Sequence, residues 1–320
     1  MKYNYYPGCS LERNASAYHD STMAIAAPLH MQFQEVEDWN CCGAVEFIAV
    51  DKIQAYALTA RNLSLAEMQT SNGENLIAPC SACFLNLSKC DAYLGESSDL
   101  AGKINEALAA GGLQYTPGAV HTRHLLDAIV NDVGYDTVAE QVTKPLYGLR
   151  VAPYYGCLIV RPGFLDKFDD PEYPTSLDKL MRALGATVVD FPMKAKCCGG
   201  HMTQISEEIS LDMIHSLLKN AADYDADVIA TICPMCQLNL DAYQHNVNKA
   251  YGTDFNIPIL YFTQLIGLAL GLSADELGFG KEFIDAAPML DKIDVEPPKK
   301  PKRKRPSKEA LPMPVMPEED

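Results

Sequence analysis

The sequence lacks the segments that would place it in a membrane or export it. No stretch approaches the roughly 20 consecutive apolar residues that a membrane-spanning helix needs. Residues 257–272 are apolar, but they include Pro258, Thr263 and Gln264 and are expected to form a core helix. The N-terminus has no charged region followed by an apolar one, because its tyrosines run straight into a cysteine motif. We therefore expect a cytoplasmic protein without a membrane span.

Positive charge is also scarce. The chain of 320 residues carries 26 Lys and Arg against 42 Asp and Glu, a formal net charge of −16. Such an acidic surface disfavours nucleic acid and anionic membranes as partners of the folded body. The basic residues that do cluster lie in a proline-rich stretch, residues 297–306. Residues 285–320 have no composition that builds a core, so they are predicted to be a disordered tail.

Cysteine, by contrast, is frequent and patterned. Ten of the eleven cysteines form two copies of one arrangement, in which a single cysteine is followed by Cys-Cys-Gly and then by Cys-x-x-Cys. The spacings are C-x31-CCG-x36-C-x2-C and C-x39-CCG-x33-C-x2-C. Five cysteines in the same order at similar spacing indicate an internal duplication. The first copy uses Cys9, Cys41, Cys42, Cys80 and Cys83, and the second uses Cys157, Cys197, Cys198, Cys233 and Cys236.

Strands and helices alternate in each copy. Long helices are expected at 45–69, 121–130 and 205–224, and this alternation predicts α/β units with mainly parallel sheets. We predict two tandem, pseudo-symmetric domains, 1–145 and 146–284. Every cysteine group follows a predicted strand, and the carboxyl ends of parallel strands share one edge of a sheet. The predicted strands are 2–6, 32–36 and 76–78 in the first copy and 151–155, 187–191 and 228–232 in the second.

The number of thiols decides which metal they suit. Soft thiolates select zinc, copper(I) or iron–sulfur clusters, and tetrahedral zinc is satisfied by four ligands. Each copy offers five cysteines, two of them adjacent, and adjacent side chains reach two metal atoms more readily than one. The pattern therefore favours a multi-iron cluster, with a structural zinc scaffold as the alternative. Cys90 lies outside the pattern, and we expect it to be a buried structural thiol.

The duplicated pattern resembles the cysteine-rich CCG domain. The opening Tyr5-Tyr6-Pro7-Gly8-Cys9-Ser10-Leu11 and the Cys-x-x-Cys-x-x-Asn-Leu phrases resemble the B subunit of heterodisulfide reductase, over about residues 1 to 280. The resemblance implies that each set of five cysteines binds one non-cubane [4Fe–4S] cluster. It implies that a disulfide is cleaved between the two clusters, with Cys42 and Cys198 essential to turnover. It also implies two partners, a C subunit that is ferredoxin-like and an A subunit that contains flavin.

Two further phrases point to a subtype. Residues 41–46, Cys-Cys-Gly-Ala-Val-Glu, resemble bacterial members of the family. Residues 13–16, Arg-Asn-Ala-Ser, and the acidic body resemble the heterodisulfide reductase-like complexes of sulfur-oxidising bacteria. In that setting the implied substrate is a sulfane sulfur or a thiol on a sulfur-carrier protein. The alternative is an electron-transfer subunit of a lactate, glycolate or glycerol-3-phosphate oxidising complex. Such chains often carry ferredoxin-type Cys-x-x-Cys-x-x-Cys runs, and their absence here favours the catalytic subunit.

Two other residues are candidates for the chemistry. His201 directly follows the second Cys-Cys-Gly-Gly and is a candidate proton donor to a leaving thiolate, or a histidine hydrogen-bonded beside the cluster. Arg161 lies four residues after Cys157 and is a candidate for neutralising an anionic substrate or cluster, or a surface salt bridge. The remaining histidines in expected helices, His124 among them, receive no function.

Overall fold

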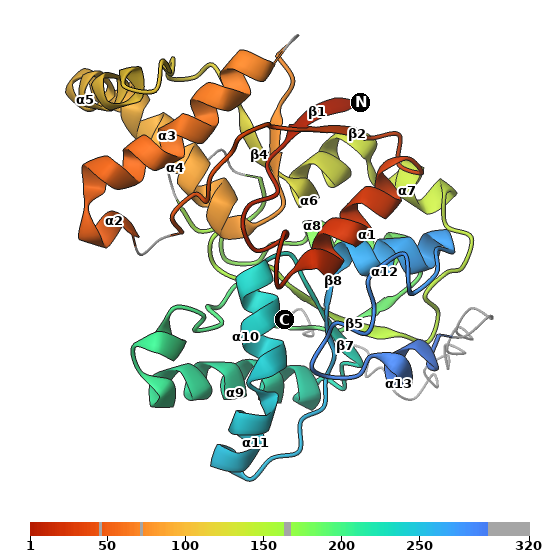
Figure 1. Cartoon of the computed structure of the whole chain (residues 1–320). Helices are drawn as coiled ribbons and strands as arrows, with labels where there is room; N and C mark the ends of the chain where they lie inside the picture. Colours follow the sequence, from red (N-terminus) through yellow and green to blue (C-terminus); the bar gives the residue numbers. More distant parts are fainter. Residues whose placement is uncertain (45–46, 71–72, 163–167, 294–320) are drawn as a thin grey trace, which may run out of the picture.

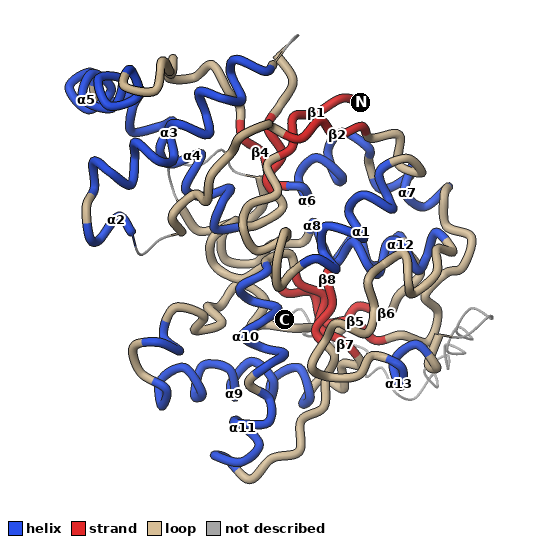
Figure 2. The backbone as a smooth tube through the Cα atoms, viewed as in Figure 1, coloured by secondary structure: helices blue, strands red, loops and turns tan. Residues whose placement is uncertain are grey.

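Two four-stranded parallel sheets form the framework of the protein. The computed structural model describes residues 1–44, 47–70, 73–162 and 168–293. The strand orders are β2-β1-β3-β4 and β6-β5-β7-β8, with every pairing parallel (Figures 1 and 2). The strands are β1 Lys2–Tyr5, β2 Gln32–Glu35, β3 Leu76–Ala78, β4 Thr122–His124, β5 Arg150–Tyr154, β6 Thr187–Val188, β7 Val228–Thr231 and β8 Ile259–Tyr261.

Helices connect the strands of each sheet. The expected α/β class and its duplication are confirmed, because the second sheet repeats the strand order of the first. The helices are α1 Ser16–Ala26, α2 Phe47–Val50, α3 Lys52–Gln69, α4 Ser81–Glu96, α5 Ser98–Ala109, α6 Leu125–Ala128, a π-helical turn η1 Ile129–Val133, α7 Tyr135–Glu140, α8 Ser176–Ala183, a 3-10 turn η2 Met202–Gln204, α9 Glu207–Asp223, α10 Pro234–Ala242, α11 Gln244–Tyr251, α12 Phe262–Leu270 and α13 Ala287–Leu290.

The fourth strand of each sheet was not predicted. β4 occupies the start of the segment expected as a helix at 121–130, and β8 lies inside the expected core helix at 257–272. Each is three residues long and leads directly into a helix, so neither shows an alternating pattern of its own. In the sheets, His124 pairs with Ala78 and Tyr261 pairs with Thr231. Because Ala78 and Thr231 each lie two residues before a Cys-x-x-Cys, the fourth strands place His124 and Tyr261 at the edge that carries the cysteines.

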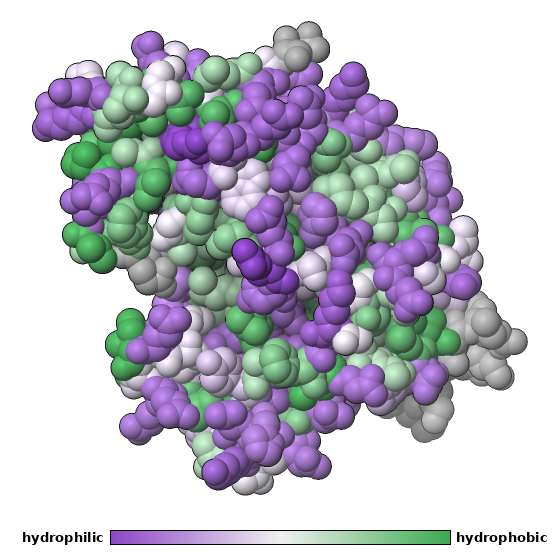
Figure 3. Space-filling view, viewed as in Figure 1, coloured by the Kyte–Doolittle hydropathy of each residue, from purple (hydrophilic) through white to green (hydrophobic). Residues whose placement is uncertain are grey.

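Helices from the two halves pack together. α1 of the first half lies beside α12 of the second (Figure 1), and Ser21 Oγ is 2.7 Å from Thr263 Oγ1 at this contact. The ring of Tyr18 on α1 stacks on that of Tyr261, with 4.3 Å between centroids and 6° between planes. One buried core therefore includes residues of both halves. Figure 3 shows a largely hydrophilic face that is hollowed between the halves, on the side of α2 and α9.

Two segments differ from expectation at their ends. The single helix predicted at 45–69 is divided into α2 and α3, because Asp51 caps α3 by accepting a hydrogen bond from Gln54 N at 2.9 Å; residues 45 and 46 lie outside the described residues. The predicted tail begins at residue 285, but the folded structure extends beyond this point to α13, where Met289 is buried. The rest of the predicted tail, 294–320, lies outside the described residues. Within them, no helix is long and apolar enough to cross a membrane.

Candidate metal centre

The five cysteines of the first half meet at the carboxyl edge of its sheet. The segments after β1, β2 and β3 each deliver part of the set. Sγ of Cys41 lies 3.4 Å from Sγ of Cys9, and Sγ of Cys42 lies 3.4 Å from Sγ of Cys83. The thiol of Cys80 interacts with that of Cys83. We call these five residues the N-terminal quintet.

The second half repeats these contacts pair by pair. Cys157 interacts with Cys197, Cys198 with Cys236, and Cys233 with Cys236, the same three pairs by position as in the first half. We call this set the C-terminal quintet. Cys90 belongs to neither quintet; it is buried in α4, as expected, and its Sγ lies 3.7 Å from the carbonyl oxygen of Tyr56.

Two hydrogen bonds hold each Cys-Cys-Gly loop in the same way. Tyr6 donates from its hydroxyl to the carbonyl of Asn40 at 2.7 Å, and Tyr154 donates to the carbonyl of Lys196 at 2.7 Å. These carbonyls immediately precede the paired cysteines. The asparagine of each Cys-x-x-Cys-x-x-Asn phrase donates from Nδ2 to the carbonyl oxygen of the second cysteine in the pair. Asn86 donates to Cys42 at 3.2 Å, and Asn239 donates to Cys198 at 2.6 Å. Both sequence phrases therefore position the loops that carry the paired cysteines.

Glycine before the first cysteine of each quintet lets a thiol approach the backbone. Gly8 has φ +75°, and a Cβ there would lie 2.8 Å from Cys83 Sγ. Gly156 has φ +67°, and its Cβ would lie 3.1 Å from Cys236 Sγ. Any larger residue would be strained by the positive φ and would also press on a thiol of the quintet.

The two quintets touch one another. The thiols of Cys80 and Cys233, one from each Cys-x-x-Cys, interact directly. The Tyr18 hydroxyl lies beside both, 3.1 Å from the carbonyl oxygen of Pro79 and 3.3 Å from that of Ile232, each the residue before one of these cysteines. The structure thus brings all ten predicted cysteines to one place, with the quintets side by side.

The crowded thiols cannot all ionise by themselves. Hydrogen bonds from Cys42 and then Cys9 lower the pKa of Cys41 to about 2. Donation to Cys41 in turn raises the pKa of Cys42 to about 11. The second half behaves alike: the pKa of Cys197 is lowered to about 2, chiefly by Cys157 and Cys198. Several thiolates so close together need positive charge among them, which metal atoms supply.

The donor set fits a group with several metal atoms better than a single ion. Across the described ranges, no three His, Cys, Asp or Glu side chains surround a point as ligands of one ion do. Each quintet instead places its thiols in a row of contacts, which in the first half runs Cys9–Cys41–Cys42–Cys83–Cys80. The glycine cradles bring one of these thiols close to the backbone. An iron–sulfur cluster has several irons to receive such thiolates, whereas zinc takes four ligands around one centre.

Comparison with known families agrees with this chemistry. The model of the cysteine-rich CCG domain matches residues 3–88 and 151–241, once for each quintet. The chain belongs to the CCG family. The two matched segments together contain all ten cysteines of the quintets.

Relatives of this CCG protein align over nearly their full length. It is 35% identical, over 89% of the chain and 98% of the relative, to the 8-methylmenaquinol:fumarate reductase membrane anchor subunit of Wolinella succinogenes. It is 30% identical, over 91% of the chain and 97% of the relative, to the B subunit of the ferredoxin/F420H2-dependent CoB-CoM heterodisulfide reductase of Methanosarcina acetivorans. A protein of Archaeoglobus profundus that is named as similar to the heterodisulfide reductase B subunit is 29% identical over 87% of the chain and 93% of the relative.

The fold is also found among solved structures. A hypothetical protein from Helicobacter pylori superposes on 89% of the chain with a TM-score of 0.68, at 15% sequence identity. The chain spans about half of that protein, 52% of its length. This likeness concerns the arrangement of the two CCG halves only.

A small cavity lies within the C-terminal quintet, and all five cysteines of that quintet line it. His201 lies in its wall, close to the cysteines as its sequence position suggested, and burial lowers the pKa of His201. Arg161 is exposed, and the described residues that line the cavity do not include it. Its positive charge nevertheless contributes to the lowered pKa of Cys197. The cavity is lined by Ser81, Tyr155, Cys157, Leu158, Cys197, Cys198, Gly200, His201, Cys233, Met235 and Cys236.

Three buried polar residues at the junction of the CCG halves were not singled out from the sequence. They are Tyr18, Ser81 and His124, all within the core. His124 fell in a stretch expected to be a helix, so its place at the end of β4, beside the cysteine edge, was hidden. The one signal that would have revealed it is its equivalence to Tyr261, which depends on recognising the fourth strands.

Proposed function

We propose that the protein is the iron–sulfur subunit of a heterodisulfide reductase-type oxidoreductase that cleaves or forms a sulfur–sulfur bond where the quintets meet. The observation that carries this proposal is the contact of Cys80 with Cys233, since it places the two thiolate sets side by side. The homology to heterodisulfide reductase B subunits over nearly their full length supports the same class of reaction.

Each quintet would hold one [4Fe–4S] cluster of the non-cubane type. The ligands would be Cys9, Cys41, Cys42, Cys80 and Cys83 for one cluster and Cys157, Cys197, Cys198, Cys233 and Cys236 for the other. Cleaving a sulfur–sulfur bond takes two electrons, and two clusters supply one each. The tyrosine and asparagine hydrogen bonds to the Cys-Cys-Gly loops keep the paired cysteines oriented.

Other side chains would serve the substrate. His201, in the wall of the cavity, is the candidate proton donor to a departing thiolate. Arg161 supplies positive charge on the exposed side of Cys197, which suits an anionic substrate or the cluster itself. We assign the physiological substrate to the sulfane-sulfur or thiol class found in sulfur oxidation, delivered by a carrier protein in the cytoplasm. Two partners, a ferredoxin-like C subunit and a flavin-containing A subunit, would carry the electrons.

Metal analysis and two variants test the proposal. Protein purified without oxygen should contain about eight iron and eight acid-labile sulfide per chain, whereas a zinc scaffold would contain zinc and no sulfide. Cys42→Ser and Cys198→Ser should each abolish turnover of disulfide or persulfide substrates. Cys90→Ser, which alters a buried thiol outside the quintets, is the matched control. Unchanged turnover in either quintet variant would refute the two-cluster reaction.

The relationship to a fumarate reductase subunit favours a second candidate. At 35% identity over 98% of the Wolinella protein, the chain is also compatible with a subunit that only transfers electrons within an oxidoreductase complex. The two functions separate in one assay. A sulfur–sulfur reductase is reoxidised by disulfide in the absence of any other subunit, whereas an electron-transfer subunit is reoxidised only through its partner or a quinone.

A further inference from the structure

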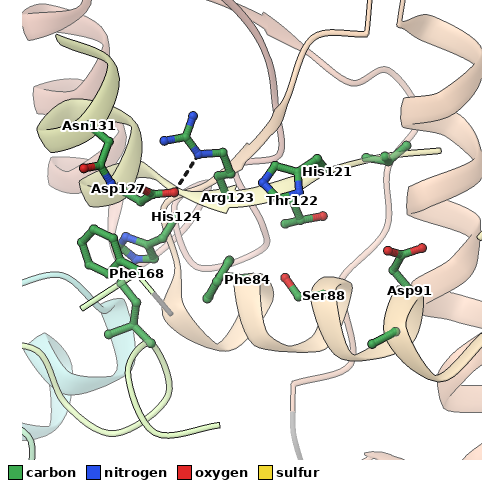
Figure 4. Close-up of a pocket in the computed structure, with 13 residues that line it drawn as sticks. Phe84, Ser88, Asp91, His121, Thr122, Arg123, His124, Asp127, Asn131 and Phe168 are labelled. Atoms are coloured by element: carbon green, nitrogen blue, oxygen red, sulfur yellow. Dashed lines mark hydrogen bonds and ion pairs between the residues drawn. The ribbon is translucent and has the colours of Figure 1, made fainter. Parts of the chain in front are cut away.

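A second, larger cavity lies along α4, the helix that carries Cys83. Its volume is about 510 Å³, within the range of roughly 300–1,000 Å³ that small-molecule sites occupy. The first half contributes α4 and parts of the chain between residues 120 and 131, and the second half contributes Ile159 and Phe168 (Figure 4). No cysteine is among the described residues that line it. The space is therefore separate from the quintets and from the clusters proposed for them.

The wall between α4 and β4 contains two hydroxyl groups without partners. Ser88 Oγ and Thr122 Oγ1 are buried and make no hydrogen bond with any other described residue. Thr122 as a whole is only 8% exposed. Figure 4 shows Ser88 on α4 and Thr122 on β4, on facing sides of the gap between these two elements. Because nearly all buried polar groups of folded proteins are hydrogen-bonded, these two hydroxyl groups indicate a partner from outside the chain.

Asp91 adds a carboxylate to the same part of the wall. It lies three residues after Ser88 and therefore on the same side of α4 (Figure 4). Its Oδ1 accepts hydrogen bonds from the Tyr115 hydroxyl at 2.6 Å and from Gly118 N at 2.7 Å, and neither donor is charged. The ion pairs among the described residues all involve other carboxylates. The negative charge of Asp91 is therefore left to a ligand.

The basic side chains of the wall do not compensate this charge. Arg123 is paired with two carboxylates, Asp127 and Asp132, each at 2.6 Å. Burial lowers the pKa of His124 to about 4, so its ring is neutral near pH 7. His121 is exposed to solvent, where water screens its interactions. The wall thus carries an excess of negative charge, which disfavours anions and favours a cation.

The end of the cavity away from Asp91 is apolar. Phe84 packs edge-to-face against His124, with 5.9 Å between centroids and 86° between planes. Figure 4 shows Phe168 at this end, beside His124. Ile159, 3% exposed, also lines the cavity. A ligand that fits both ends has an apolar body and a cationic head.

We propose that this cavity binds a primary amine with an apolar body, whose ammonium group donates hydrogen bonds to Asp91, Ser88 and Thr122. An ammonium group has three N–H donors, and these side chains each offer an oxygen acceptor. The bond to Asp91 is charge-assisted and is the strongest of the set. The apolar body lies against Phe84 and Phe168. This site goes beyond the proposed function, since it involves no cysteine and no redox step.

Three compounds that share a phenyl ring test the charge of the ligand. Benzylamine, benzyl alcohol and benzoate carry a positive, a neutral and a negative head. Cluster-loaded, full-length protein is titrated with each in about 0.15 M salt, which screens distant surface charges, and calorimetry gives the dissociation constants. Benzylamine should bind at least about tenfold more tightly than benzyl alcohol, as expected for a hydrogen bond to a charged group, and benzoate should not bind. Equal affinities for the three compounds, or no binding of benzylamine, would overturn the proposal; in the second case the hydroxyl groups bind water only.

Variants test the residues that hold the ammonium group. Asp91→Asn keeps an oxygen acceptor for Tyr115 and Gly118 but loses the charge, and it should weaken benzylamine binding at least about tenfold. Asp99→Asn is the matched control, because it removes an exposed carboxylate of α5 that pairs with Lys103, and it should leave the affinity unchanged. Equal iron and sulfide content in all proteins shows that the fold is intact.

The hydroxyl group of Thr122 is tested in the same way. Thr122→Val has nearly the same size but no hydroxyl, and it should weaken benzylamine binding, whereas Thr122→Ser should not. An unchanged affinity in Thr122→Val would overturn the part given to this hydroxyl. An unchanged affinity in Asp91→Asn, or an equal loss in Asp99→Asn, would show that benzylamine is attracted by the acidic surface as a whole and would overturn the site.

Discussion

Replacing Gly156 by alanine should release iron from one half of the protein only. At φ +67° an alanine is in the left-handed region, where an L-residue costs roughly 1–2 kcal/mol. Its Cβ would also lie 3.1 Å from Cys236 Sγ, inside the usual contact distance of about 3.5–4.0 Å. The thiol must therefore move by several tenths of an ångström, and a ligand of the C-terminal quintet is displaced.

Gly252 provides a matched control for this prediction. It has nearly the same backbone angle, φ +66°, but a Cβ there meets nothing within 4 Å. Gly252→Ala should therefore lower the free energy of unfolding by the same roughly 1–2 kcal/mol of backbone strain, without touching a thiol. The difference between the two variants isolates the contact with Cys236 from the strain.

The assay is iron and sulfide content together with urea unfolding. Gly156→Ala should lose about half of the bound iron, since it disturbs only one of the two proposed clusters, and the EPR signal that remains should belong to the N-terminal quintet. Gly8→Ala should lose the other half, because its Cβ would lie 2.8 Å from Cys83 Sγ. Equal iron in Gly156→Ala and Gly252→Ala would refute the reasoning that the glycine makes room for a thiol.

Three further predictions concern the junction and the core. Tyr18→Phe keeps the stacked ring but removes one hydroxyl donor from two buried carbonyls, and urea unfolding should show a loss of about 0.5–1.5 kcal/mol. Lys194→Met leaves the buried Asp178 carboxylate, 3.0 Å from Lys194 Nζ, unpaired; stability should fall by about 3–5 kcal/mol, and adding Asp178→Asn should recover most of it. Burial raises the pKa of Asp241 to about 6, so the folded state binds this proton more tightly than the unfolded chain. The stability of the wild type relative to Asp241→Asn should therefore rise by about 0.8 kcal/mol between pH 7.5 and 5.5, and a fall would contradict the assignment.

The meeting of the cysteines was predictable because it follows from chain topology. Once Cys9, Cys41 and Cys80 are each placed after a parallel strand, the sheet brings them to one edge whatever the intervening sequence. The contact between Cys80 and Cys233 did not follow, because it depends on how α1 packs against α12. That packing is set by side chains such as Tyr18, whose aromatic and hydroxyl groups give no periodic signal of their role.

Ser81 and His124 were hidden for different physical reasons. Ser81 lies inside a cysteine motif, where a small polar residue is unremarkable, and only the fold places it against the thiols of the other half. His124 ends a strand of three residues, too short for its pattern to be separated from the helix that follows. In both cases the information lies in contacts between distant segments, which local propensity does not contain.

The duplication makes the differences between the halves informative. Hydrogen bonds to the Cys-Cys-Gly loops, thiol pairs and glycine cradles are the same in both, so the means of holding a cluster is symmetric. The residues beside the cysteines are not: Ser81 in the first half corresponds to Pro234 in the second, and His124 corresponds to Tyr261. A substrate with two identical halves would gain nothing from this asymmetry. If the quintets act on one disulfide as proposed, its two sulfurs would therefore meet different side chains.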